Sequence, residues 1–446
     1  MKTLCCVLAI LLPGSSAVAD TIVFLNVNVI PMTEETVQTG RTVIVSDGVI
    51  TVIGNVDETP VPEEAMVIDG TDRYLLPGLA EMHAHVPGGD SENLDRILHL
   101  YVANGITTIR GMLGQASHLE LRSALADGSR LGPRLVTSGP SLNGRSVTSP
   151  ADAVRMVEQQ KAAGYDFLKI HPGLTREEFD AMAAAADRLG MRFAGHVPED
   201  VGIERALEAG IATIDHLDGY MESLLRPHVD NSGGLGGFFG VFIADQADAT
   251  RIPGIAAATA KAGVWNVPTE SLFRHATSAA TDPDDMVDWP EMKYMPAATV
   301  AAWRRSKREL LDDSNYRPQT AEHAIRLRQQ LILALQRSGA GLLLGSDSPQ
   351  IFNVPGFSVH HELRYLVDAG LTPFEALQAG TVNPARFLGE TGKFGEVTTG
   401  AAADLLLLDA NPLDDLGNSR RIHGVMLRGR WLSRAELDAL LDELAR

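Results

Sequence analysis

The sequence predicts an α/β protein: a (β/α)8 TIM barrel with a small β-sandwich domain that both ends of the chain form together. From residue 78 onward, short β-rich runs alternate with helical patterns, as in the repeated βα units of a parallel sheet. Eight such runs occur, and eight parallel strands close a barrel, although periodicity alone leaves an open doubly wound sheet as an alternative. Strand-like segments lie before and after this region, and neither can bury its apolar face alone.

The first nineteen residues have the layout of a secretory signal peptide. Lys2 precedes an apolar run from Leu4 to Leu12, and Ala17-Val-Ala19 provides a small-residue cleavage site. The run has nine residues, whereas a membrane-spanning helix needs about twenty, so cleavage after Ala19 is favoured over a membrane anchor. We therefore expect an exported protein, periplasmic or secreted. Both cysteines, Cys5 and Cys6, lie in this segment, so the mature chain is expected to contain no disulfide.

The chain is acidic, with a formal net charge of −19 over 446 residues. Loss of the predicted signal peptide removes Lys2 and leaves 37 basic against 57 acidic residues, a charge of −20. This charge disfavours a nucleic-acid partner and otherwise serves solubility. With 45% hydrophobic residues over this length, one large domain and a smaller one are expected.

Both ends of the mature chain are predicted to be β-structure. Residues 20–77 contain short strands with a turn at Asp47-Gly48, and residues 395–446 are again strand-like. We expect these two segments to form the composite sandwich, because each can bury the apolar face of the other. The barrel then comprises residues 78–394.

The barrel region presents its strands and helices in order. Two helices carry a capping box at their start, Thr175 to Glu178 and Thr372 to Glu375, and Gly190 and Gly380 stand where those helices are expected to stop. The eight predicted strands are residues 78–86, 105–110, 133–140, 165–172, 192–198, 212–218, 264–269 and 341–347.

Two long insertions, residues 219–250 and 270–320, follow the sixth and seventh predicted strands. Loops after the strands of such a barrel line the mouth of the active site, so these insertions are predicted to be lids over a substrate. An equal alternative is that the insertions are surface segments without a role at the active site, or that they form a contact between copies in a homo-oligomer.

Four histidines stand at the carboxyl ends of predicted strands. His83 and His85 end the first strand, and residues two apart on a strand point the same way, so both imidazoles face one point of the barrel mouth. His196 and His216 end the fifth and sixth strands. A single histidine there is more often a hydrogen-bonded polar residue, but four in equivalent positions predict a metal site.

Lys169 and Asp347 complete the candidate ligands. Lys169 interrupts an apolar run at the end of the fourth strand, where an ammonium is costly to bury without a partner. It is either half of a buried ion pair with a barrel acid, or a neutral amine that takes up carbon dioxide to become a metal-bridging carbamate. Asp347 ends the eighth strand, where a carboxylate can bind a metal and accept a proton from metal-bound water, or simply cap a helix.

With these residues in place, the sequence resembles the amidohydrolase superfamily of metal-dependent hydrolases, in particular its imidazolonepropionase-like and Xaa-Pro dipeptidase (prolidase) group. The resemblance covers nearly the whole mature chain. It rests on Leu76-Pro-Gly-Leu-Ala-Glu-Met-His-Ala-His85, Gly195-His-Val-Pro198, Ile214-Asp-His-Leu217, Gly345-Ser-Asp347, Asn383-Pro-Ala-Arg386, and Gly400-Ala-Ala-Ala-Asp404 with Asp409-Ala-Asn-Pro412.

The resemblance implies a site for two divalent metal ions, usually zinc. His83, His85 and Asp347 would hold one ion, His196 and His216 the other, and carbamylated Lys169 would bridge them together with a hydroxide. The implied reaction is hydrolysis of an amide C–N bond in a small substrate such as a dipeptide or N-acyl amino acid, with Asp347 as the proton shuttle. A catalytically inactive binding protein is disfavoured, because none of the six ligands is missing.

Glu199 keeps a second chemistry open. It follows His196 in a His-x-x-Glu spacing that resembles mononuclear relatives, such as imidazolonepropionase and cytosine deaminase, in which this glutamate shuttles protons. The alternative is therefore a one-metal hydrolase of cyclic amides or a heterocycle deaminase, and Lys169 favours two metals instead. For substrate binding, the candidates beside Glu199 are Tyr220, His275 with its neighbour Arg274, and His361, which follow strands six to eight and could bind a carboxylate or carbonyl.

Overall fold

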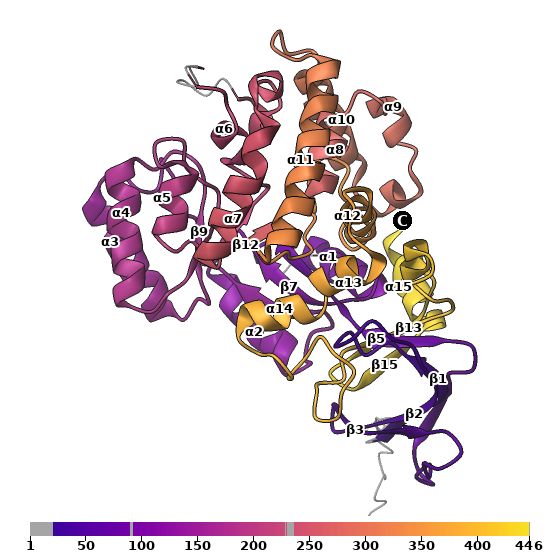
Figure 1. Ribbon diagram of the computed structural model, residues 1–446. Coiled ribbons are helices and arrows are strands. Elements are labelled where there is room, and N and C mark those ends of the chain that lie inside the picture. The colour runs from indigo at the N-terminus through magenta and orange to yellow at the C-terminus, as the bar shows by residue number, and fades with distance from the viewer. Residues whose placement is uncertain (1–20, 90–91, 228, 230–235, 446) are drawn as a thin grey trace, which may run out of the picture.

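The computed structural model describes residues 21–89, 92–227, 229 and 236–445 (Figure 1). The predicted signal peptide, with both cysteines, lies outside these residues and stays a prediction. Among the described helices, none combines the length and the apolar character that crossing a membrane requires.

Both ends of the chain meet in one mixed sheet, as predicted, but the strands pair continuously and do not divide into the two facing sheets of a sandwich. The order is β15-β14-β13-β5-β1-β2-β3, with β4 beside β1. The reason lies in β1, whose first half pairs in parallel with β4 and whose end pairs in parallel with β5. The strands are β1 (Thr21–Val29), β2 (Gln38–Ser46), β3 (Val49–Asn55), β4 (Met66–Asp69), β5 (Tyr74–Pro77), β13 (Leu405–Leu408), β14 (Ile422–Leu427) and β15 (Arg430–Ser433).

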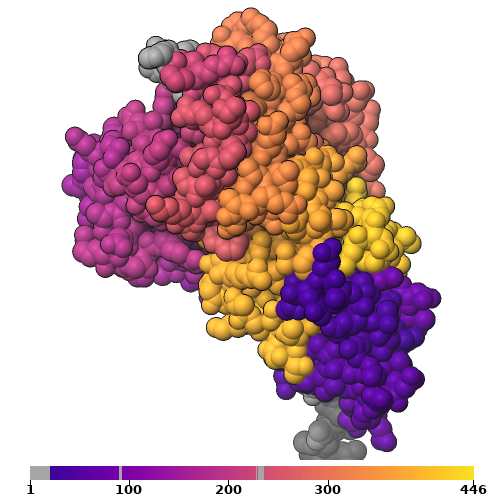
Figure 2. Space-filling view, viewed as in Figure 1, coloured from indigo at the N-terminus to yellow at the C-terminus, as the bar shows by residue number. Residues whose placement is uncertain are grey.

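Strand β13 joins this sheet to the rest of the molecule. Its four leucines are all fully buried, and they alternate between two hydrophobic cores. Leu405 and Leu407 pack in the core of the chain-end sheet, whereas Leu406 and Leu408 pack in the large core of the barrel region. Because successive strand side chains point to opposite faces, one apolar strand fills both cores. Figure 2 shows the indigo N-terminal and yellow C-terminal residues packed together against the remainder.

Seven of the eight predicted barrel strands are present, in two parallel sheets. The first has the order β6-β7-β8 and the second the order β12-β11-β10-β9. An isolated parallel bridge between Ser138 and Phe167 joins β8 to β9. The strands are β6 (Leu79–Ala84), β7 (Ile106–Gly111), β8 (Arg134–Thr137), β9 (Leu168–Ile170), β10 (Phe193–Gly195), β11 (Thr213–Asp215) and β12 (Trp265–Val267).

The eighth predicted strand, residues 341–347, is not a regular strand, so no closed eight-stranded barrel is formed by continuous ladders. It makes isolated parallel bridges on both sides, Leu342 to Asn266 and Ser348 to Ala84. Between these bridges the buried carboxylate of Glu81 takes the backbone N–H of Ser346 at 2.8 Å. The next residue, Asp347, then turns into the left-handed region at φ 61°. The Glu81 side chain thus accepts the Ser346 N–H that a regular β-ladder would direct to a backbone carbonyl of the neighbouring strand.

Helices surround the parallel strands in Figure 1, and both capping boxes that the sequence predicts are formed, at Thr175 and Thr372. Within its described residues, the first insertion contains α6 and the 3₁₀ turns at 238–240 and 244–246, and a third turn at 249–251 begins at its end. The second insertion is largely helical and contains α8 to α10 with a further 3₁₀ turn at 290–294. The helices are α1 (Glu92–Ala103), α2 (Ser117–Ala126), α3 (Pro150–Ala163), α4 (Arg176–Arg188), α5 (Gly202–Glu208), α6 (Tyr220–Ser223), α7 (Ile252–Ala262), α8 (Glu270–Thr277), α9 (Pro283–Met286), α10 (Ala297–Leu311), α11 (Pro318–Ser338), α12 (Phe357–Asp368), α13 (Pro373–Ala379), α14 (Val382–Leu388) and α15 (Arg434–Leu444).

Candidate metal centre

Three of the predicted ligands converge at the carboxyl end of β6. The ligand atoms of His83, His85 and Asp347 all lie within 4.8 Å of one another. The Nε2 of His85 is 2.8 Å, and that of His83 is 3.6 Å, from Oδ1 of Asp347. His83 and His85 are two residues apart on one strand, and their rings stack at 5.6 Å as the strand period predicts.

The other three predicted ligands lie against this group. The ring of His216 is 4.5 Å from that of His83 and 4.7 Å from that of His196. Lys169 approaches through Asp215, whose Oδ2 lies 3.9 Å from the Lys169 Nζ and 3.1 Å from Nδ1 of His83. The fold therefore brings all six predicted ligands into one contiguous cluster.

The donor atoms of this cluster fit a cation. Nε2 of His83 and the Nζ of Lys169 are buried without a hydrogen-bond partner in the part of the chain that the structure describes. Nδ1 of His83 and Oδ2 of Asp215 lie 3.1 Å apart, but their orientation forms no hydrogen bond, so both are unsatisfied as well. Unpartnered buried polar atoms are costly, so such a concentration of them is expected where a bound group would supply the missing interaction. Imidazole nitrogens and carboxylate oxygens are ligands of zinc and similar divalent ions.

Neighbouring side chains orient two of the histidines. The Nδ1 of His196 lies 3.0 Å from Oδ2 of Asp218, and the Nδ1 of His216 lies 2.9 Å from Oγ1 of Thr269. With Nδ1 engaged, Nε2 of each ring is the nitrogen left to bind a metal. Sequence reasoning missed both partners, although Asp218 stands two residues after His216 and ends the same predicted strand.

Burial sets the protonation of the cluster. It lowers the pKa of Lys169 to about 8, against the opposing charge of Asp215. Burial, with the Lys169 charge next in size, holds the pKa of His83 well below its usual value. The predicted alternative for Lys169, an ion pair with a barrel acid, exists only as the 3.9 Å approach to Asp215. Asp215 is mainly engaged elsewhere, because its Oδ1 accepts from Arg110 at 3.1 Å.

His171 is a further member that sequence reasoning missed. Its ring stacks on that of His196 at 5.0 Å, and burial followed by the Lys169 charge lowers its pKa to about 2. The signal was present, because Lys169 and His171 are two residues apart at a strand end, just as His83 and His85 are.

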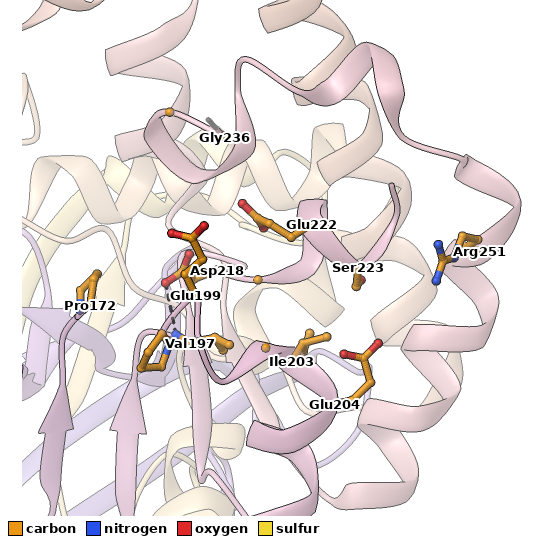
Figure 3. Close-up of a pocket in the computed structure, with 14 residues that line it drawn as sticks. Pro172, Val197, Glu199, Ile203, Glu204, Asp218, Glu222, Ser223, Gly236 and Arg251 are labelled. Carbon is orange, nitrogen blue, oxygen red and sulfur yellow. Dashed lines mark hydrogen bonds between the residues drawn. The ribbon is translucent and has the colours of Figure 1, made fainter. Parts of the chain in front are cut away.

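A cavity of about 420 Å³ is lined by residues that closely follow two of the candidate ligands in the chain, Val197 after His196 and Asp218 after His216, although neither histidine lines it (Figure 3). Residues that follow the strand ends line it, including Val197 and Asp218, and so does Glu199. Its lining is acidic. It contains one basic residue, Arg251, and four carboxylates, those of Glu199, Glu204, Asp218 and Glu222. Burial raises the pKa of Asp218 to about 6 and that of Glu222 to about 7, the latter helped by the charge of Asp218.

The remaining candidate substrate residues do not line this cavity. Tyr220 is buried, and its hydroxyl donates to Oδ1 of Asn266 at 2.7 Å. His275 and His361 lie together, with ring centres 5.4 Å apart, and His361 approaches Glu291 at 3.2 Å. Their neighbour Arg274 pairs with Asp368 at 3.2 Å. Their predicted roles in substrate binding stay predictions.

Part of the first insertion covers the centre. Phe239, in the 3₁₀ turn 238–240, stacks on His216 at 4.7 Å and on His196 at 6.0 Å. The insertion predicted to be a lid therefore does reach the candidate ligands within its described residues.

The chain is similar to known proteins in sequence and in fold. The amidohydrolase family profile matches residues 74–432. Bottromycin amidohydrolase is 25% identical, with a TM-score of 0.74 over 96% of this chain and 90% of that chain. A Bifidobacterium longum protein assigned as a prolidase is 24% identical (TM-score 0.67; 96% and 100% covered). A Xaa-Pro dipeptidase with methionine bound in its active site is 20% identical (TM-score 0.66; 93% and 100% covered). None of the curated proteins compared with the chain matches it.

Proposed function

The chain belongs to the amidohydrolase family, metal-dependent hydrolases that act on carbon–nitrogen bonds, and from that premise we propose that it hydrolyses the amide bond of a small substrate such as a dipeptide or an N-acyl amino acid. The observation that carries the proposal is the convergence of His83, His85 and Asp347 on one point, beside His196, His216 and Lys169. The likeness to bottromycin amidohydrolase supports an amide as the substrate. The 420 Å³ cavity that Val197 and Asp218 line has room for a molecule of this size.

For the first ion the ligand assignment rests on the geometry, and for the second ion it rests on the resemblance to the family. His83, His85 and Asp347 would hold one divalent ion, and His196 and His216 a second. Lys169, carbamylated, would bridge the two, and its depressed pKa favours the neutral amine that a carbamate requires. Such ions, zinc by preference, supply an activated water and polarise the substrate carbonyl.

Asp347 would act as the proton shuttle. Its Oδ1 already accepts from Nε2 of Gln350 at 2.9 Å and lies 2.8 Å from His85, so Oδ2 is the freer oxygen. This oxygen takes the proton of the attacking water and delivers it to the departing amine. Phe239, over the rings of His196 and His216, would exclude bulk water from that transfer.

A second candidate function uses Glu199 with a single metal to hydrolyse a cyclic amide or to deaminate a heterocycle. Its support is the position of Glu199 in the wall of the cavity, beside the residues that follow His196.

Two structural proposals accompany the function. The bridges from Leu342 to Asn266 and from Ser348 to Ala84 support a barrel that closes through residues 341–348. The layout of residues 1–19 supports export to the periplasm or the medium.

Metal analysis of the purified mature protein, with a screen of dipeptides, N-acyl amino acids and cyclic amides, tests the function. We expect two metals per chain, amide hydrolysis, and loss of both the second metal and activity in Lys169→Ala. Lys161→Ala removes an exposed lysine on α3 and is the matched control, expected to behave as the wild type. Full activity and two metals in Lys169→Ala would refute the carbamate bridge. One metal with deaminase activity, abolished by Glu199→Gln, would establish the second candidate instead.

A further inference from the structure

Arg328 of α11 places a fully buried guanidinium behind the candidate metal centre. The residue is 2% exposed, and all three of its nitrogens donate to groups at the carboxyl ends of β11 and β12. Nη1 donates to the carbonyl of His216 at 2.7 Å, Nη2 to the carbonyl of Pro268 at 2.8 Å, and Nε to Oε1 of Glu270 at 2.5 Å. One side chain thus joins a candidate ligand to the end of the neighbouring strand.

The backbone that Arg328 contacts is in an uncommon conformation. His216, Leu217 and Thr269 have φ values of 64°, 53° and 50°, in the left-handed region that side chains other than glycine rarely adopt. The N–H of His216 still pairs with Val267 at 2.8 Å, but its carbonyl turns toward the guanidinium. The surrounding contacts must therefore hold this turn in place.

The buried charge of Arg328 is balanced locally. Glu270 is fully buried and supplies the counter-charge, and the ring of Phe273 lies 4.2 Å from the guanidinium carbon. Glu362 of α12 accepts the backbone N–H groups of Glu270 and Ser271 at 2.9 and 2.6 Å. The end of β12 is therefore clamped between α11 and α12.

This clamp also reaches the ring of His216. Thr269, adjacent to both Pro268 and Glu270, contacts Nδ1 of His216 through its hydroxyl at 2.9 Å. Arg328 consequently fixes His216 twice, at the carbonyl directly and at the ring through the segment that carries Thr269. Because both the carbonyl and the ring of His216 are held in place, its Nε2 can point in only one direction.

We propose that Arg328 is a positioning residue for His216 and sets the affinity of the metal that His216 and His196 would share. The inference rests on the proposed function. Arginine is required because its planar fork reaches two carbonyls and a carboxylate at once, whereas the single ammonium of lysine cannot span all three.

Arg328→Lys tests this, with Arg134→Lys as the matched control. Arg134 likewise pairs with a carboxylate, Glu390, at 2.5 and 2.7 Å and lies over an aromatic ring, Phe394, but it stands at the opposite end of a strand, at the start of β8. Zinc affinity and stoichiometry are measured by chelator competition, and the thermal midpoint of the metal-free protein is measured in parallel. We expect Arg328→Lys to weaken one zinc site by about 10- to 100-fold while the other keeps its affinity.

Arg134→Lys is expected to lower the thermal midpoint without changing either affinity. Should Arg328→Lys fold poorly, the double variant Arg328→Met with Glu270→Gln removes both buried charges, and the same selective loss is expected. The inference is overturned if every zinc that the wild type binds is bound equally well by the variants, or if all sites weaken in step with the thermal midpoint. Failure of the proposed function would be a separate result, because the wild-type protein would then bind zinc but hydrolyse no amide.

Discussion

Lys307 offers a quantitative test of the packing in the second insertion. Its side chain is fully buried on α10, and its ammonium contacts the Sδ of Met286 at 3.3 Å. Burial lowers the pKa of Lys307 from 10.5 to about 8, partly opposed by the charge of Asp282. At about 1.4 kcal/mol per pH unit, this difference corresponds to about 3 kcal/mol of unfolding free energy. We predict that Lys307→Met stabilises the protein at neutral pH by about this amount.

The pH dependence follows from the sign of the shift. Between about pH 8 and 10.5 the unfolded chain holds the lysine proton and the folded chain does not, so the wild-type free energy of unfolding rises with pH across this window. Below about pH 8 both states are protonated, and the full cost of the buried charge remains. The advantage of Lys307→Met is therefore largest near pH 7 and shrinks toward zero near pH 10.5.

Urea unfolding of both proteins at several pH values from about 7 to about 10 measures this difference. Lys293→Met removes an exposed lysine in the same insertion and is expected to leave stability unchanged at every pH. A difference between wild type and Lys307→Met that does not vary with pH would refute the reasoning, because a buried, partly neutral lysine requires that variation.

Two further predictions concern the strand ends. Asp218→Asn removes the carboxylate at Nδ1 of His196 and is expected to weaken metal binding by about 10- to 100-fold with little loss of thermal stability, and unchanged affinity in a chelator competition would contradict this orienting role. Gly195→Ala would place a Cβ 2.4 Å from the carbonyl of Ile170 at φ 127°, so we expect a loss of more than about 3 kcal/mol in urea unfolding. Gly190→Ala, at φ 58° with no atom within 4 Å of the added carbon, is the control and should cost about 1 kcal/mol; equal losses would show that the contact with Ile170 is unimportant.

The helices with strong local signals were predictable. The capping boxes at Thr175 and Thr372 were read from the sequence and are formed, because the side chain and the backbone N–H that it caps are three residues apart. The strands at the chain ends were predicted from the sequence, but their arrangement in one continuous sheet was not. Their alternating apolar residues indicate a buried face, whereas the choice between one continuous sheet and two facing sheets depends on which strand lies beside β1.

Residues 341–347 show why a local pattern can mislead. Their apolar run predicts a strand, but Ser346 gives its N–H to Glu81, a residue 265 positions earlier in the chain. Of the candidate substrate residues, Glu199 lines the cavity, whereas Tyr220, His275 and His361 do not, for a similar reason. Tyr220 lies soon after a strand end in sequence, yet its hydroxyl points to Asn266 in the interior.

The sequence by itself determined that four histidines and a lysine stand at strand ends, because the two-residue period of a strand is local and needs no partner. It could not determine what surrounds them. Asp218, Thr269 and Arg328 lie 22 to 112 positions from the histidines that they contact, and no periodicity relates residues that far apart. Which nitrogen each histidine offers to a metal, and how firmly His216 is held, was decided only when the chain folded and buried those partners beside it.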